Sequence, residues 1–463
     1  MKSQKKLTKN HGYLLFISLI SAMGGFLFGY DWVVVGGAKP FYEVFFHITE
    51  LPAMQGWAMG SAIAGCLLGV MVSGSLSDRY GRKPLMLIAA VIFIIASIGT
   101  GAVGTISWFI VYRILGGVGI GIVSNLSPMY IAEVSPAELR GRFVSINQLT
   151  IVLGILSAQV INWLIADPVA VGENILASWN GQMGWRWMFW VCTVPAAVFF
   201  VMIFFIPESP RWLASRLHYQ KAESALARIG GSDYAHSELN EIKSTVQKDR
   251  QNLNFRMLVE GRMPKILLIG VIIAVLSQWC GINIIFNYAQ EIFAGAGYGV
   301  SDILFNIVIT GVTNVIFTFV GMFAVDRIGR RALLLFGAAG LACIYAILGT
   351  CYYFQTTGIV MLCLVLVAIA CFAMTLAPIT WVVLSEIFPN RIRAMAMAVA
   401  TFSLWTACFV ITYTFPLLNK GLGSYGTFWL YGVICILGFF FIKKMLPETK
   451  GKSLEEIEKI LSK

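Results

Sequence analysis

The sequence has 463 residues, of which 58% are hydrophobic and only 12% are charged, and its formal net charge is +11. Because a soluble domain carries about 25% charged residues, this composition excludes a soluble enzyme, a disordered chain and a secreted disulfide scaffold. The Lys and Arg residues flank apolar segments, which is typical of oriented membrane helices and not of a nucleic-acid-binding surface.

Twelve apolar stretches are long enough to span a bilayer, for which a helix needs roughly 20 residues. The segments between them carry charges, prolines or glycines, so we predict an all-α membrane protein with twelve transmembrane helices. In chain order the stretches cover residues 13–36, 56–76, 85–104, 107–129, 143–166, 187–206, 265–288, 302–324, 332–353, 359–383, 394–417 and 427–446.

The segment between the sixth and seventh stretches differs from the other gaps because it is rich in charges. Its apolar residues recur every three or four positions, which predicts short amphipathic helices on a soluble face. We therefore expect two six-helix bundles joined by a cytoplasmic helical linker. The expected parts are a first bundle at 1–207, the linker at 208–263, a second bundle at 264–447 and a short tail helix at 448–463.

The distribution of basic residues predicts how the helices cross the membrane. If the N-terminus lies in the cytoplasm, only Lys39, Arg186 and Lys420 lie on the opposite face, and Arg113 falls inside a span. The other 30 of the 34 Lys and Arg residues (34 − 4) are then cytoplasmic, as the positive-inside rule requires. We therefore predict a multi-pass protein, surrounded by membrane lipids, whose two termini are both cytoplasmic.

Three loop motifs occur twice, once in each half of the chain. Each copy follows the corresponding apolar stretch of its half. These repeats predict two parallel, pseudo-symmetric halves related by an axis along the membrane normal. The matched segments are 74–83 with 321–331, 133–142 with 386–393, and 207–211 with 447–451.

Carboxylates and guanidinium groups cluster in these repeated loops, at the predicted cytoplasmic ends of the helices. Charge-assisted bonds between them can hold that face closed, and opening the face must break them. The alternative is that they only anchor helix ends and set the topology. The predicted gating residues are Asp78, Arg79, Arg82, Glu133, Arg140, Arg142, Glu208, Arg211, Asp326, Arg327, Arg330, Glu386, Arg393 and Glu448.

The glycine-rich segment at 116–121 has a spacing similar to that of a dinucleotide-binding loop. It lies within an apolar span, and no strand precedes it. We therefore predict that its small residues allow close helix packing and that the segment binds no nucleotide. The nine cysteines also lie in apolar stretches, without the Cys/His spacing that binds a metal.

Together, these motifs resemble those of the sugar porter family within the major facilitator superfamily. The loop of the GxxxDRxGRR type is shared by the superfamily, whereas PESPRW at 207–212, PETKG at 447–451 and SQWCGIN at 277–283 are typical of sugar porters. The resemblance implies the major facilitator fold, rocker-switch alternating access and one sugar site between the halves at mid-membrane. We expect a transporter that works as a monomer, without a cofactor, in a bacterial inner membrane.

Two ionisable side chains lie within predicted spans, Asp31 in the first and Arg113 in the fourth. An intramembrane charge costs at least about 2.5–3.5 kcal/mol, so it usually faces a cavity and has a partner. If the water access of Asp31 or its distance from Arg113 changes between conformations, Asp31 takes up and releases a proton once per cycle. The resemblance assigns proton coupling to the same pair, since residues 28–31 read FGYD. A static pair that fixes two helices is the alternative.

A sugar site requires side chains that bind hydroxyl groups and aromatic rings that stack on the sugar ring. Amides both donate and accept hydrogen bonds, yet they are costly in a bilayer unless they are satisfied. The resemblance supports the same positions, and hydrogen bonding between helices is the alternative. The predicted sugar-binding residues are Gln148, Gln278, Asn283, Asn314, Trp381 and Trp405, with Phe28, Ser277 and Asn287.

Four positions differ from the pattern of the family. Ser277 stands where relatives have glutamine, and Ile155 replaces a second glutamine of the xylose symporters. Leu404 replaces the polar residue that precedes Trp405, and Asn287 replaces the first of two paired tyrosines. Ile155 and Leu404 make the site more apolar, so a pentose, a hexose and a 6-deoxy sugar all remain open as substrates.

A proton-coupled monosaccharide symporter is therefore the leading hypothesis, and a facilitative sugar uniporter differs from it only in coupling. A sugar sensor would need a cytoplasmic signalling domain, for which the tail after Pro447 is short. A proton-driven drug antiporter would share the fold and Asp31 but would need a broad apolar pocket without the amides. The sequence has no nucleophile–base arrangement that would support an enzyme.

Overall fold

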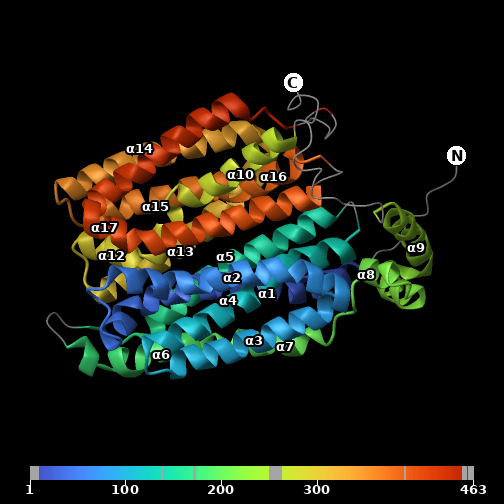
Figure 1. Ribbon diagram of the computed structural model, residues 1–463, viewed down its shortest axis with the longest axis horizontal. Helices are drawn as coiled ribbons and strands as arrows, with labels where there is room; N and C mark the ends of the chain where they lie inside the picture. The colour runs from blue at the N-terminus through green and yellow to red at the C-terminus, as the bar shows by residue number, and fades with distance from the viewer. Residues whose placement is uncertain are drawn as a thin grey trace.

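The architecture is helical throughout the part of the chain that the computed structural model describes. Figure 1 shows two groups of long helices that lie side by side, the first coloured blue to green and the second yellow to red. The predicted all-α fold is therefore confirmed. The described residues are 10–136, 139–169, 174–249, 263–389, 393–450 and 456.

The first group contains six spans, the last of which is assembled from short helices. The sixth span follows a single 3-10 turn, η1 (Ile175–Ala177), and consists of the π-helical turn η2 (Asn180–Gly184), α6 (Trp185–Val191) and α7 (Thr193–Ile203). The first five spans are α1 (His11–Phe45), α2 (Pro52–Tyr80), α3 (Arg82–Ala102), α4 (Ile106–Val134) and α5 (Arg140–Ile165).

α1 is longer than the span predicted at 13–36. It continues to Phe45, because Phe41 and Tyr42 are buried against the bundle and hold the last turns of the helix in place. As a result, Lys39 and Glu43 lie on a buried helix and not in an exposed loop. The span predicted at 13–36 was therefore too short, and it left out two charges, Lys39 and Glu43, that are buried on the same helix.

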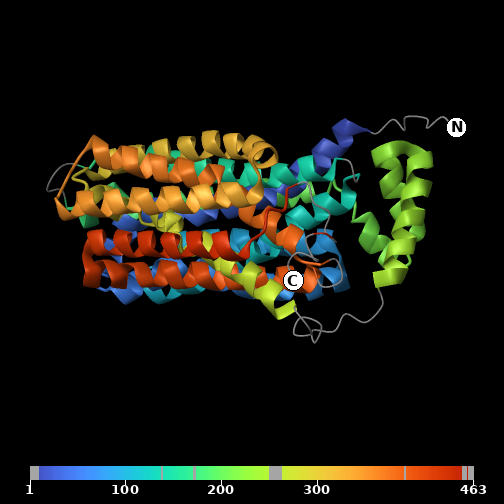
Figure 2. The ribbon, with the colours of Figure 1, turned by 90° about the horizontal axis from the view of Figure 1, so that it is seen from above.

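Two further helices follow the first group, α8 (Pro210–Ser215) and α9 (Tyr219–Asp249). The backbone of α9 leaves the helical conformation at Gly231, so α9 consists of two helical segments. Figure 2 shows both helices, in green, at one end of the bundle. We call this the linker end, and we call the opposite end, where α1 terminates, the far end. Of the predicted linker, residues 250–262 lie outside the described residues.

The second group also contains six spans, two of which are broken. The seventh span consists of α10 (Met263–Trp279), α11 (Ile282–Asn287) and α12 (Ala289–Gly295), followed by α13 (Val300–Ile328) and α14 (Arg330–Tyr353). Thr375 separates α15 (Ile359–Met374) from α16 (Leu376–Ile387) in the tenth span. Gly423, at φ 69° and ψ 170°, divides α17 (Arg393–Met445) into the last two spans. The described helices thus provide the twelve spans that were predicted.

The two groups meet along two seams. One seam joins α2 to α17, and the other joins α5 to α13. Near the far end, α1 also contacts α11 and α12. A site at the centre of the molecule is therefore bordered by α1, α2, α4 and α5 on one side and by α11, α13 and α17 on the other.

Close packing of α2 against α4 depends on glycine. A Cβ atom added to Gly117 would overlap the carbonyl oxygen of Ala62, and one added to Gly121 would overlap that of Cys66. Gly65 on α2 is in the same situation against Ile114 on α4. The prediction that the glycine-rich segment at 116–121 serves helix packing is confirmed, and α4 is thereby held where Arg113 faces α1.

We predict that Gly117→Ala lowers the thermal stability of the purified protein. The added methyl group must push α2 away from α4, and overpacking of this kind costs about 1–3 kcal/mol. Gly74→Ala is the matched control, because a Cβ on Gly74 of α2 has no heavy atom within 4 Å. Alanine favours a helix over glycine, so the control keeps or raises the melting temperature. Equal melting temperatures for the two variants would contradict this packing argument.

Candidate functional site

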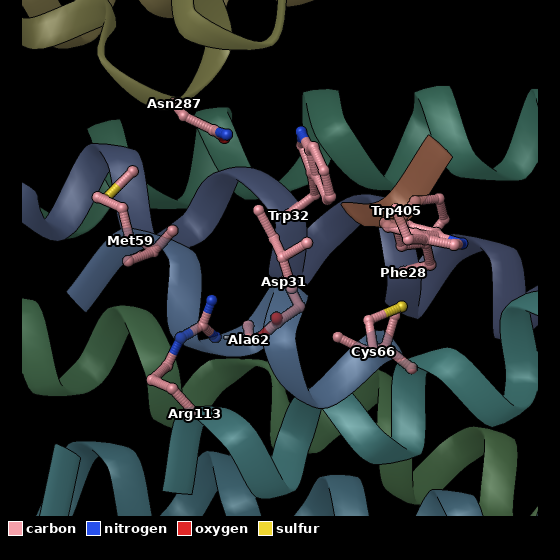
Figure 3. A pocket seen from close by; sticks show the side chains of 12 residues that line it. Phe28, Asp31, Trp32, Met59, Ala62, Cys66, Arg113, Asn287 and Trp405 are labelled. Carbon is pink, nitrogen blue, oxygen red and sulfur yellow. Dashed lines mark hydrogen bonds and ion pairs between the residues drawn. The ribbon is translucent and has the colours of Figure 1, made fainter. Parts of the chain in front are cut away.

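Asp31 and Arg113 form a buried ion pair between α1 and α4. Nη1 of Arg113 donates a hydrogen bond of 2.5 Å to Oδ1 of Asp31, and the two residues are only 3% and 5% exposed. The guanidinium also lies 5.5 Å from the ring centre of Phe189, so its charge is partly stabilised by an aromatic face. Figure 3 shows the two side chains pointing toward each other. The structure thus brings together the two charges singled out in the sequence.

A small cavity lies beside this ion pair. Its volume is about 20 Å³, which is room for roughly one water molecule. Asp31, Arg113 and Trp32 line it from the first group of helices, while Asn287 and Trp405 line it from the second (Figure 3). The carboxylate of Asp31 therefore faces a space that both groups of helices enclose.

Three aromatic rings close one side of the cavity. The ring of Trp405 on α17 lies 5.5 Å from Phe28 and 5.8 Å from Trp32, both on α1, and these two rings are 5.7 Å apart. Such edge-to-face contacts stabilise the approach of the two groups of helices. Phe28 and Trp405 were predicted as sugar-binding residues. Trp32 was missed, although its position directly after Asp31 could have indicated it.

The amides of the seventh span form a cluster of their own. Nε2 of Gln278 donates to Oγ of Ser277 at 3.1 Å, and Nδ2 of Asn283 donates to Oε1 of Gln278 at 2.5 Å. Gly281, at φ 85°, lies between α10 and α11, and this break allows the chain to bring these amides together. Asn287 is buried at the end of α11, and its Oδ1 has no hydrogen-bond partner. An unpaired oxygen beside the cavity is free to accept a bond from a ligand.

Six predicted sugar-binding residues do not line the small cavity. Ser277, Gln278 and Asn283 belong to the cluster of the seventh span, and the other three lie elsewhere. Gln148 on α5 is half-buried, and Asn314 on α13 is buried. These two helices contact each other and form one of the two seams. Trp381 on α16 is 40% exposed. In this arrangement of the helices, these residues are therefore not gathered with Asp31, Asn287 and Trp405.

A second cluster of charges, which the sequence analysis missed, joins the two groups of helices at the far end. Nζ of Lys39 lies 2.8 Å from Oε1 of Glu43, one turn along α1, and also pairs with Glu291 on α12. Lys39 is only 1% exposed and lies 5.4 Å from the ring centre of Tyr288. Lys39, Glu43 and Glu291 border a polar cavity of about 350 Å³ at the far end, together with Glu50. The i, i+4 spacing of Lys39 and Glu43 was the available sequence signal.

The repeated loops at the linker end form two matched networks. In the first, Nε and Nη2 of Arg82 donate to the two oxygens of Glu133 at 3.0 and 2.9 Å, and Glu208 accepts from the backbone N–H of Arg82 at 3.0 Å. In the second, Arg330 pairs with Glu386 at 3.0 Å. The ion pairs of Arg82 with Asp78 and Glu133 lie within the first group of helices, and that of Arg330 with Glu386 lies within the second.

The remaining predicted gating residues are less clearly placed. Asp78 pairs with Arg82 at 3.2 Å, and Nε of Arg140 donates to the backbone oxygen of Ala132 at 3.0 Å. Arg79 stacks on its neighbour Tyr80. The structure gives no ion pair for Arg142, Arg211 or Arg327, and the side chains of Asp326 and Arg393 lie outside the described residues.

The two glutamates that end the matched networks differ electrostatically. Burial raises the pKa of Glu208, and backbone N–H donors, among them those of Ser209 and Arg82, only partly offset this effect. Burial also raises the pKa of Glu448, but N–H donors that include those of Lys450 and Arg330 outweigh it and lower the pKa overall. The second network therefore holds its carboxylate more firmly in the charged form.

Comparison with known proteins decides the family. The family model described as "Sugar (and other) transporter" matches residues 17–461. This chain belongs to that family. The D-xylose–proton symporter of Escherichia coli K12 is 38% identical over 479 residues, covering 97% of this chain and 96% of its own length. The arabinose–proton symporter of Bacillus subtilis is 38% identical over 457 residues, covering 98% and 97%. The predicted family is thereby confirmed.

A solved structure supports the fold of this sugar transporter family member. The inward-open conformation of the xylose transporter of E. coli matches with a TM-score of 0.85 and 36% identity, and the match covers 97% of this chain and all of that one. The transporter is thus a multi-pass membrane protein with the major facilitator fold. Among the described residues of the transporter, no three His, Cys, Asp or Glu side chains lie close enough together to hold a metal ion.

We predict that Glu291→Gln weakens closure of the transporter at its far end. The variant removes the charge that attracts Lys39 across the two groups of helices, and a bond to a charged group contributes about 1.5–3 kcal/mol. Spin labels at Thr49→Cys and Asn419→Cys, which border the far-end cavity from opposite sides, should move apart in a background without native cysteines. Glu50→Gln is the control, because Glu50 borders the same cavity but is exposed to solvent. Identical distance distributions in both variants would show that the pair does not hold this end closed.

Proposed function

We propose that this protein is a proton-coupled monosaccharide symporter that works by alternating access. The observation that carries the proposal is the buried pair of Asp31 and Arg113 beside a cavity enclosed by both groups of helices. A change in the protonation of Asp31 at this position alters the charge that both halves face. The names of the relatives, which are proton symporters of xylose and arabinose, support the same activity.

Asp31 is the proposed proton acceptor. Burial favours the neutral form of a carboxyl group, whereas a guanidinium at hydrogen-bond distance favours the anion. In the present arrangement Arg113 holds Asp31 directly, and the adjacent space admits about one water molecule. When the halves rearrange and loosen this pair, Asp31 takes up a proton from the open side. When the pair forms again, the proton leaves on the opposite side.

The proposed sugar site lies between the halves, next to Asp31. Phe28 and Trp405 offer aromatic faces to the C–H groups of a sugar ring, and Asn287 offers an unpaired oxygen to a hydroxyl group. Gln278 and Asn283 supply further amides. The remaining candidates, Gln148, Ser277, Asn314 and Trp381, join the site as the halves move. The ligand is a pentose, a hexose or a deoxyhexose.

The two ends of the bundle are the proposed gates. Lys39 and Glu291 hold the far end closed, and the networks around Arg82 and Arg330 hold the linker end when it closes. The basic loops favour a cytoplasmic linker end, with both termini on that side. We place the transporter in a bacterial inner membrane, where it works as a monomer among lipids. It needs no cofactor and performs no enzymatic reaction.

A facilitative sugar uniporter is the second candidate. The observation that favours it is the tightness of the ion pair, since Asp31 and Arg113 are both buried and 2.5 Å apart. A pair that stays intact throughout the cycle would fix α1 to α4 without carrying a proton. Such a protein would equilibrate sugar across the membrane and would not accumulate it.

We predict that adding the transported sugar to de-energised cells alkalinises the medium and that Asp31→Asn abolishes this change. The panel comprises D-xylose, L-arabinose, D-glucose, D-galactose, D-fructose, L-fucose, L-rhamnose and myo-inositol. One proton crossing 100 mV supplies about 2.3 kcal/mol, which supports roughly 40-fold accumulation in energised cells. Asp31→Asn should only equilibrate the sugar, because an amide cannot carry the proton.

The control for this experiment is Asp167→Asn, which changes an exposed carboxyl group beyond the end of α5. It should retain both proton uptake and accumulation. Equilibration of labelled sugar by the wild-type protein without any pH change would favour the uniporter and overturn coupling through Asp31.

A further inference from the structure

Gln159 on α5 is a buried amide without a hydrogen-bond partner. Gln159 is only 2% exposed, and neither its Oε1 nor its Nε2 forms a hydrogen bond. Most buried polar atoms in proteins have a partner, so an amide with both ends unpaired calls for an explanation. The amide of Gln278, by contrast, is bonded to its neighbours.

The position of Gln159 on α5 relates it to the proposed sugar site. Successive residues of an α-helix are about 100° apart, so Gln148, Ile155 and Gln159 fall within about 40° of one another around the helix axis. One face of α5 therefore presents an amide, an apolar side chain and a second amide in a row. Ile155 offers only methyl and methylene groups, which suit the C–H face of a sugar and bind no hydroxyl group.

The side chain of Gln159 packs against α13, which belongs to the other half of the transporter. A Cβ atom on Gly311 of α13 would overlap Oε1 of Gln159, so the amide occupies the space that this glycine leaves. Asn314, a proposed sugar-binding residue, lies three residues further along α13, on nearly the same face. Gln159 thus lies in the seam between α5 and α13, and movement of the halves changes what covers it.

We propose that Gln159 binds a hydroxyl group of the transported monosaccharide in the conformation that opens the seam between α5 and α13. A free amide both donates and accepts, as a hydroxyl group does, so the two can form complementary bonds. The sugar hydroxyl at Gln159 lies toward the far end, and an apolar C–H or methyl group of the same sugar contacts Ile155. This inference deepens the proposed function and rests on it.

The test compares Gln159→Leu with the wild-type protein in reconstituted vesicles. The substrate is whichever sugar of the panel above produces proton uptake. We expect KM to rise about tenfold, which corresponds to the loss of one hydrogen bond to the sugar. The melting temperature without sugar should stay the same or rise, because leucine removes an unpaired polar group from a buried position. The increase in melting temperature that the sugar causes should become smaller.

Gln182→Leu is the matched control. Its amide donates to the backbone oxygen of Leu176 at 2.6 Å in an exposed turn, away from the seam. KM should be unchanged in this variant. If Gln159→Leu does not fold, Gln159→Met, which keeps the length of the side chain, is measured by the same criteria.

Two results separate this inference from the proposed function. An unchanged KM together with a lower melting temperature in the Gln159 variant would show that the amide is structural, and would overturn the role of Gln159 alone. A wild-type protein that moves none of the eight sugars would overturn the proposed function, and with it the inference.

Discussion

The ion pair of Asp31 and Arg113 is the constraint on which the arrangement of the helices depends. Two opposite charges within a membrane bundle are stable only when they approach closely and are surrounded by further favourable contacts. α1 and α4 must therefore stay in register, and the glycines between α2 and α4 allow the close packing that this requires. Trp405 then covers the pair from the other half. This buried ion pair of the first half thus lies beside the cavity that both halves enclose.

Much of the fold could be predicted, because runs of about 20 apolar residues have a stable environment only in a bilayer. Asp31 and Arg113 could be paired from sequence for the same reason, since a charge within such a run requires a partner. The pair of Lys39 and Glu291 could not, because the first apolar stretch was taken to end at residue 36, before Lys39. Lys39 is buried only because α1 continues and because Glu291, 252 residues away, approaches it.

How the proposed sugar-binding residues are arranged could be predicted less completely, for a different reason. Gln278 and Asn283 are close in sequence, and the break at Gly281 suffices to bring them together. Gln148 and Asn314 belong to opposite halves, so their distance depends on how the halves are arranged. A site that forms between two moving bodies is complete only in some of their arrangements, and sequence identifies its members without saying when they meet.

α1 connects these features mechanically. It carries Asp31, Trp32 and Lys39, and the eight residues from Asp31 to Lys39 span roughly 12 Å of helix. Between them, a Cβ on Gly37 would overlap the amide of Asn162 on α5, so α1 has no room to move independently of α5 there. Lys39 contacts Glu291 of the second group of helices, and Trp32 contacts Trp405 of the same group, so one helix carries both contacts between the groups. In the proposed transport cycle, movement of α1 links opening of the far end to the proposed sugar site and to the proposed proton acceptor Asp31.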